Sequence, residues 1–164
     1  MAIDAVVGKI KRSKIQTFID TSGPTGSETY FLLGEGIIAG DIEYNPKILE
    51  ETYVSEDSPN VSVESYAPKQ SIDMASIAGD EAFDYIDALR VARAVLTAAE
   101  TTIVNVWMYE AGGPATYVAE QQKVCISIET FGGEGGSTAR VAFTIHYIDD
   151  PTVGTFDVSD NSFT

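Results

Sequence analysis

The feature of this sequence that most constrains its fold is a pair of alternating segments joined by a glycine-rich turn. Apolar and polar side chains alternate along residues 123–131 and again along residues 140–148, which is the period of a half-buried β-strand. Glycines occupy four of the five positions from 132 to 136, and they tolerate the positive φ that hairpin turns need. The two segments predict a β-hairpin and favour a mainly β fold.

Other segments predict strands by alternation or by their content of β-branched and aromatic residues. These are residues 14–20, 30–33, 37–44, 70–74 and 103–110. Residues 49–54 and 61–66 are expected to form a long polar hairpin, because Ser58, Pro59 and Asn60 between them are typical of turns.

One segment has the period of an α-helix. Over residues 81–96, apolar side chains recur every three or four positions, and Asp80 is a suitable N-cap. The fold class expected is therefore mainly β, a β-sandwich or open barrel with one flanking α-helix and a long polar hairpin. A single domain over residues 1–164 is expected, with an N-terminal arm at about 1–13 and a C-terminal arm at about 149–164.

Composition argues against several classes of function. The 25 acidic residues face 10 basic ones, so binding of nucleic acid through clustered cations is not expected. The single Cys125 and single His146 are too few for a disulfide or for a structural zinc site. The glycine-rich turn lacks the Lys and Ser or Thr of a phosphate-binding loop. We expect no enzyme activity, no cofactor and no metal, and no segment approaches the length of a membrane span.

The negative charge is concentrated in one part of the chain. Residues 28–64 contain nine acidic residues and one basic residue, Lys47. A solvated sheet face would explain this charge, and so would strands that meet a partner, because long open strands are otherwise prone to aggregate.

The order of these elements resembles that of the major tail proteins, or tail tube proteins, of long-tailed bacteriophages. The resemblance rests on residues 44–79, the helix residues 84–89, the turn at 131–136 and residues 147–156. It implies a virion protein, assembled in the host cytoplasm, whose copies form hexameric rings that stack into a tail tube. The implied partners are the chain itself, a tape-measure protein, DNA passing through the lumen without tight binding, and the tail terminator and baseplate proteins, with no membrane.

The resemblance also implies two groups of functional residues. An acidic lumen would weakly repel DNA, and the candidates on the predicted polar strands are Glu43, Glu50, Glu51, Glu64 and Asp73. Candidates for contacts between rings are Ile3, Val6, Val7, Ile10, Glu56, Asp57, Ser58, Pro59 and Asn60. Two alternatives stay open. One is a related tube or tail-terminating subunit, including one from a contractile tail or a type VI secretion tube, and the other is a soluble acidic binding module or DNA mimic.

Overall fold

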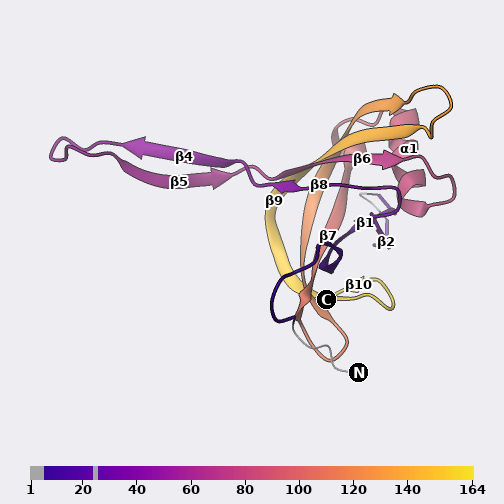
Figure 1. The fold of residues 1–164 in the computed structure, drawn as a ribbon, viewed down its shortest axis with the longest axis horizontal. Coiled ribbons are helices and arrows are strands. Elements are labelled where there is room, and N and C mark those ends of the chain that lie inside the picture. The colour runs from indigo at the N-terminus through magenta and orange to yellow at the C-terminus, as the bar shows by residue number, and fades with distance from the viewer. Residues whose placement is uncertain (1–5, 24–25) are drawn as a thin grey trace.

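The computed structural model describes residues 6–23 and 26–164, and the expected fold class is confirmed (Figure 1). The elements in chain order are η1 (Arg12–Lys14), β1 (Ile15–Asp20), β2 (Tyr30–Leu32), β3 (Ile42–Glu43), β4 (Pro46–Glu51), β5 (Asn60–Tyr66), β6 (Lys69–Ala75), α1 (Glu81–Ala92), η2 (Leu96–Ala99), β7 (Glu100–Ala111), β8 (Tyr117–Gly132), β9 (Arg140–Asp157) and β10 (Ser162–Phe163). Within the described residues, the main sheet is antiparallel and has the order β2-β1-β7-β8-β9-β6-β3, with β10 paired to β9.

The predicted hairpin of residues 123–131 and 140–148 is present as β8 and β9, and both strands are longer than expected. The register shifts between Gln121 and Lys123 and again between Ile128 and Thr130, and bulges of this kind bend a strand. The turn between the strands requires glycine at Gly132 and Gly136, where φ is 147° and 83°. The sheet therefore curves along these two long strands (Figure 1).

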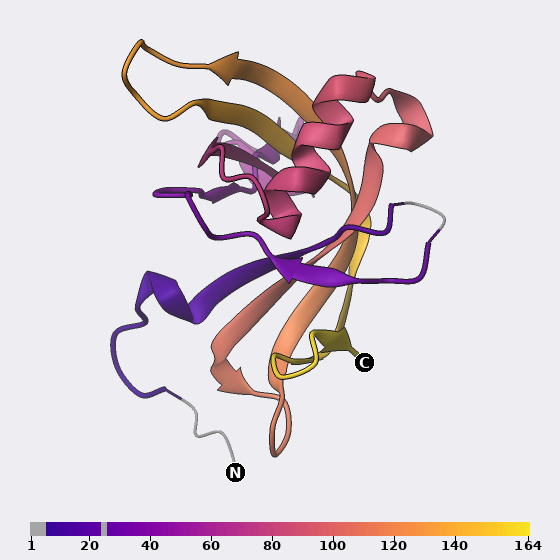
Figure 2. The same ribbon diagram turned by 90° about the vertical axis from the view of Figure 1, so that its right-hand side faces the viewer.

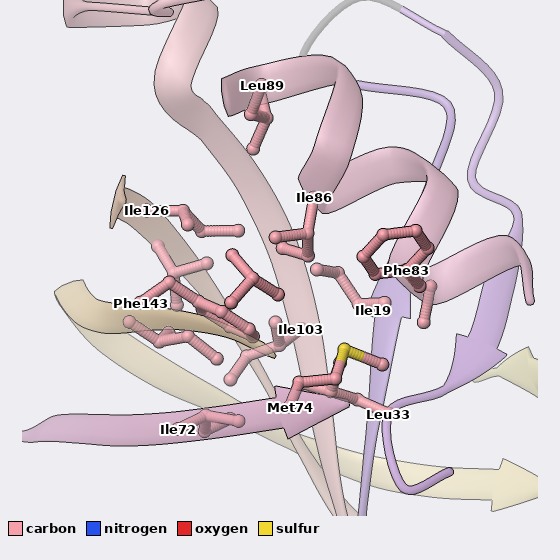
Figure 3. Packing of buried hydrophobic residues seen from close by; sticks show 14 residues of the cluster. Ile19, Leu33, Ile72, Met74, Phe83, Ile86, Leu89, Ile103, Ile126 and Phe143 are labelled. Atoms are coloured by element: carbon pink, nitrogen blue, oxygen red, sulfur yellow. The ribbon is translucent and has the colours of Figure 1, made fainter. Parts of the chain in front are cut away.

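The larger core lies between α1 and one face of the sheet (Figure 3). Phe83, Ile86 and Leu89 of α1 are buried against a sheet surface that includes Ile103 and Phe143. Burying each of these side chains stabilises the fold by about 1.5–3 kcal/mol. The buried apolar side chains of β7 and β9 and those on one side of α1 thus form a single cluster.

Helix α1 begins where the sequence predicts and ends four residues earlier. Asp80 accepts a hydrogen bond from the Phe83 N–H at 3.2 Å, as an N-cap does. The helix stops at Ala92 because Arg93 adopts the left-handed conformation, with φ of 47°. The Ala94 N–H then bonds to the Leu89 carbonyl at 3.1 Å, which is the closing hydrogen bond of a Schellman C-cap.

A smaller core lies on the opposite face of the sheet. Phe156 of β9 is completely buried there, with its ring 4.5 Å from that of Phe18 and 6.1 Å from that of Tyr30. Strand β10 pairs back onto the end of β9, close to the C-terminus (Figure 2). The segment expected as a C-terminal arm, about 149–164, therefore lies largely in β9 and β10 of this structure.

The strand predicted over residues 37–44 is mostly absent. Only Ile42–Glu43 forms a strand, and Ile37 makes an isolated bridge to Met74. Gly36 has a φ of 78° and lies so close to Ala75 that a Cβ at this position would be 2.9 Å from the Ala75 Cβ. The chain turns sharply at this glycine, so a continuous strand does not start here. No helix in the described ranges has the length and hydropathy needed to cross a membrane.

Candidate functional site

The most unusual feature of the molecule is the hairpin of β4 and β5, which projects away from the body (Figure 1). These strands pair with each other in a sheet of their own, and every residue of both is exposed. A two-stranded hairpin with no packed face is marginally stable in water. Contacts from outside this subunit are therefore expected along the hairpin.

One face of the hairpin carries most of its exposed apolar side chains. Ile48 is directly opposite Val63, and Glu50 is directly opposite Val61, and residues that face each other across a ladder lie on the same side. Ile48, Val61 and Val63 therefore form one apolar stripe, with exposed fractions of 51%, 64% and 50%. The sequence predicts a polar hairpin here and does not by itself reveal the stripe, although the alternation of Val61 and Val63 is a signal for it.

The hairpin separates two of the five lumen candidates. Glu50 lies on the face of the apolar stripe, whereas Glu51 lies on the opposite face, because neighbours along a strand point to opposite sides. The two carboxylates therefore do not face the same surface.

The other three lumen candidates each form an ion pair within the chain. The pairs join Glu43 to Lys69 at 3.7 Å, Glu64 to Lys47 at 2.8 Å and Asp73 to Arg140 at 2.9 Å. All three pairs are substantially exposed, so each contributes only about 0–1 kcal/mol to stability. Their main effect is electrostatic, because each lysine or arginine cancels the negative charge of its carboxylate.

Asp73 belongs to a polar sheet face formed by β6, β8 and β9 on the side opposite α1. This face is defined by Ser71, Asp73, Ser127, Glu129, Thr144 and His146. The apolar side chains on the same strands, Ile72, Ile126 and Phe143, point instead into the core under α1. The polar sheet face is therefore a surface that solvent or another subunit can cover.

His146 and Ser127 lie close together on this face, with 3.1 Å between the imidazole Nε2 and the Ser127 Oγ. Glu129 accepts a hydrogen bond from the serine hydroxyl at 3.3 Å and another from Thr144 Oγ1. In a Ser-His-acid triad the carboxylate orients the histidine and not the serine. This arrangement is a polar network across the strands rather than a nucleophilic triad.

A buried polar ladder crosses the sheet beneath the base of the hairpin. Thr17 Oγ1 donates to Asn105 Oδ1 at 2.8 Å, and Asn105 Nδ2 donates to the Tyr147 hydroxyl at 3.1 Å. The hydroxyl in turn donates to Gln70 Oε1 at 3.4 Å. Burial raises the pKa of Tyr147 to about 12, partly offset by the Asn105 hydrogen bond, so the phenol stays protonated at neutral pH. The ladder links side chains of β1, β7, β9 and β6 and stabilises the sheet at the base of the hairpin.

The candidates for contacts between rings are exposed wherever the structure describes them. Glu56, Asp57, Ser58, Pro59 and Asn60 form the tip of the hairpin, where the Asn60 amide donates to Glu56. Val6, Val7 and Ile10 are exposed in the N-terminal segment. Ile3 lies outside the described residues. Their exposure makes these residues available to a partner.

Comparison with known proteins identifies the fold. No protein-family model and no curated protein matches the sequence. Among solved structures, the chain is similar to one from the tail of an empty gene transfer agent (GTA) particle, computed with helical refinement in C6 symmetry. The TM-score is 0.64 at 12% sequence identity, and the match covers 88% of this chain and 98% of that chain. The resemblance to tail tube proteins is thus confirmed at the level of the fold.

Proposed function

We propose that this chain is a structural, non-enzymatic subunit of a phage-like virion tail, in which hexameric rings of the chain stack into a tube. The observation that carries the proposal is the fold shared with a subunit of a C6-symmetric tail over nearly the whole length of both chains. The exposed hairpin supports it independently, because an apolar stripe on a projecting two-stranded ribbon is suited to burial against another subunit. Strands contributed by several subunits can also close into a barrel wider than one subunit can enclose.

The proposed tube conducts DNA along a lumen that includes Glu51. A tube that buries the apolar stripe also covers Glu50, because both lie on one face of the hairpin, and it leaves the Glu51 face free. An acidic wall repels DNA over roughly 8 Å at physiological salt, whereas a cationic wall binds phosphates by releasing their counterions. In this arrangement the tape-measure protein and then DNA occupy the lumen without tight binding, and the tail terminator and baseplate proteins cover the tube ends.

Self-assembly is the first prediction of this proposal. Purified protein at raised concentration or under crowding is expected to form rings with sixfold symmetry, and tubes made of stacked rings, in negative-stain electron microscopy. Sedimentation velocity should show the same species in solution. A chain that stays monomeric under all these conditions would contradict the proposal. Small uniform particles that bind a basic protein would instead support an acidic binding module or DNA mimic.

Reversing the charge of Glu51 tests the lumen. Tubes assembled from Glu51→Lys protein are expected to retain duplex DNA at about 50 mM salt and to release it above about 200 mM, because repeated lysines add counterion-release contacts. Co-sedimentation measures retention, and resistance to nuclease separates DNA inside the tube from DNA bound outside. Glu51→Gln is the matched control and should retain none. Equal DNA retention by the Lys and Gln variants would mean that Glu51 does not line the lumen.

A further inference from the structure

The C-terminal end of α1 lies near one end of the β8–β9 hairpin (Figure 2). Residues of both line an open, partly apolar cleft. We call it the helix-end cleft. Its volume is about 670 Å³, and its apolar lining residues include Leu89, Val95, Ile126, Ile128 and Phe131. Val95 and the adjacent Leu96 are 69% and 86% exposed. Large apolar side chains gathered at one rim in this way are typical of an interaction surface.

The cleft carries charges of both signs, because Arg90, Arg93 and Glu129 are among its lining residues. Arg90 forms an ion pair with Asp87 at 2.7 Å and lies over the Phe131 ring at 4.1 Å. Arg93 also lines the cleft and is exposed. The other bases of residues 15–164 all form ion pairs with a carboxylate, so Arg93 is the one unpaired base in this described part of the chain. Arg93 can therefore pair with an acidic side chain of a partner, as can the exposed bases Lys9, Lys11 and Arg12 of the N-terminal segment.

The hairpin has the complementary properties. Its apolar stripe is flanked on the same face by Glu50, and residues 46–66 contain five acids and one base. The hairpin and α1 lie on opposite sides of the subunit (Figure 1), so the stripe of one chain cannot reach its own cleft. Two different patches on opposite sides of one subunit produce a head-to-tail contact, and such contacts close into rings or continue as filaments.

We infer that the helix-end cleft receives the apolar stripe of the hairpin from a second copy of this chain, with Glu50 facing Arg93. This inference rests on the proposed self-assembly and specifies which surfaces make the contact. It also gives a reason for a strained residue. Arg93 has the positive φ that usually selects glycine after a helix, and strain of this kind is often retained where a residue has a function.

A charge exchange tests the contact. Arg93→Glu alone and Glu50→Arg alone are each expected to raise the critical concentration for assembly roughly tenfold or more, because each places like charges together in the interface. The double variant should recover much of the loss. Arg93→Gly separates assembly from folding: it removes the charge and the strained φ together, so its thermal midpoint should be at least that of the wild type while its assembly is weaker.

Disulfide trapping locates the contact directly. In a Cys125→Ser background, Val63→Cys protein mixed with Val95→Cys protein is expected to give cross-linked dimers on oxidation under assembly conditions. Val153→Cys, at an equally exposed position on β9, is the matched control and should give far fewer. Tubes that form normally with the single variants Arg93→Glu, Glu50→Arg and Arg93→Gly would overturn this inference and leave the proposed function standing, and so would cross-linking no greater than the control. Failure of the wild type to assemble would overturn both.

Discussion

Replacing Ile48, Val61 and Val63 together by threonine is expected to abolish ring and tube formation and to leave the subunit folded. Each threonine buries less apolar surface in the contact and also buries a hydroxyl, which costs about 1–3 kcal/mol without a hydrogen-bond partner, so the three changes together weaken each contact by about 5 kcal/mol. That change reduces an association constant by more than about a thousandfold. Threonine keeps the β-branched shape that suits a strand, and none of the three side chains belongs to either core. Sedimentation velocity measures assembly, and circular dichroism measures folding.

The matched control for the stripe is Leu49→Thr. Leu49 is also an exposed apolar residue of β4 and lies on the opposite face of the same hairpin. We expect this variant to assemble much more like the wild type. If the triple variant forms tubes at wild-type concentrations, the stripe is not an interface. If Leu49→Thr is equally damaging, the hairpin is needed as a whole and the face assignment is wrong.

Phe156→Ala is expected to lower the free energy of unfolding of the isolated subunit by about 3–5 kcal/mol, the usual cost of deleting a buried phenylalanine. Phe156 is completely buried and packs against Phe18 and Tyr30 in the smaller core. The neighbouring side chains relax only partially around such a cavity, so most of the cost remains. Urea denaturation of the monomer at low concentration measures the change.

Val153→Ala is the control on the same strand. Val153 is 68% exposed, so its loss should change the free energy of unfolding by less than about 0.5 kcal/mol. A similarly small effect of Phe156→Ala would mean that the last residues of the chain are detached from the free subunit and act as an arm. A large effect would establish that they complete the core before assembly.

Local pattern determined much of this fold. The alternation of residues 123–131 and 140–148 has a period of two, which fits only a strand with one buried face, and the structure has β8 and β9 there. The cap at Asp80 and the spacing of Phe83, Ile86 and Leu89 similarly fix where α1 begins and which side it buries. These features depend on residues close together in the chain, so the sequence alone reveals them.

The candidate site was predicted less completely, because its character depends on neighbours across strands. The sequence predicted a long polar hairpin and its acidic residues, although the first strand, expected over 49–54, lies at Pro46–Glu51. It could not show that a register shift between Lys47 and Ile48 places Ile48 opposite Val63, and this pairing creates the apolar stripe. Nor could it show that Asp73 meets Arg140, 67 positions away. Both facts follow from strand pairing, which local periodicity does not specify.

The sequence by itself determined that the chain is mainly β, where its one α-helix begins and that a long acidic hairpin interrupts the fold. The tertiary structure alone decided that α1 stops at Arg93, that β9 continues to Asp157 and that Phe156 lies in a core. The physical reason is that burial and positive φ are set by what surrounds a residue in space. Phe156 is buried by Phe18 and Tyr30, which lie more than a hundred residues away in the chain.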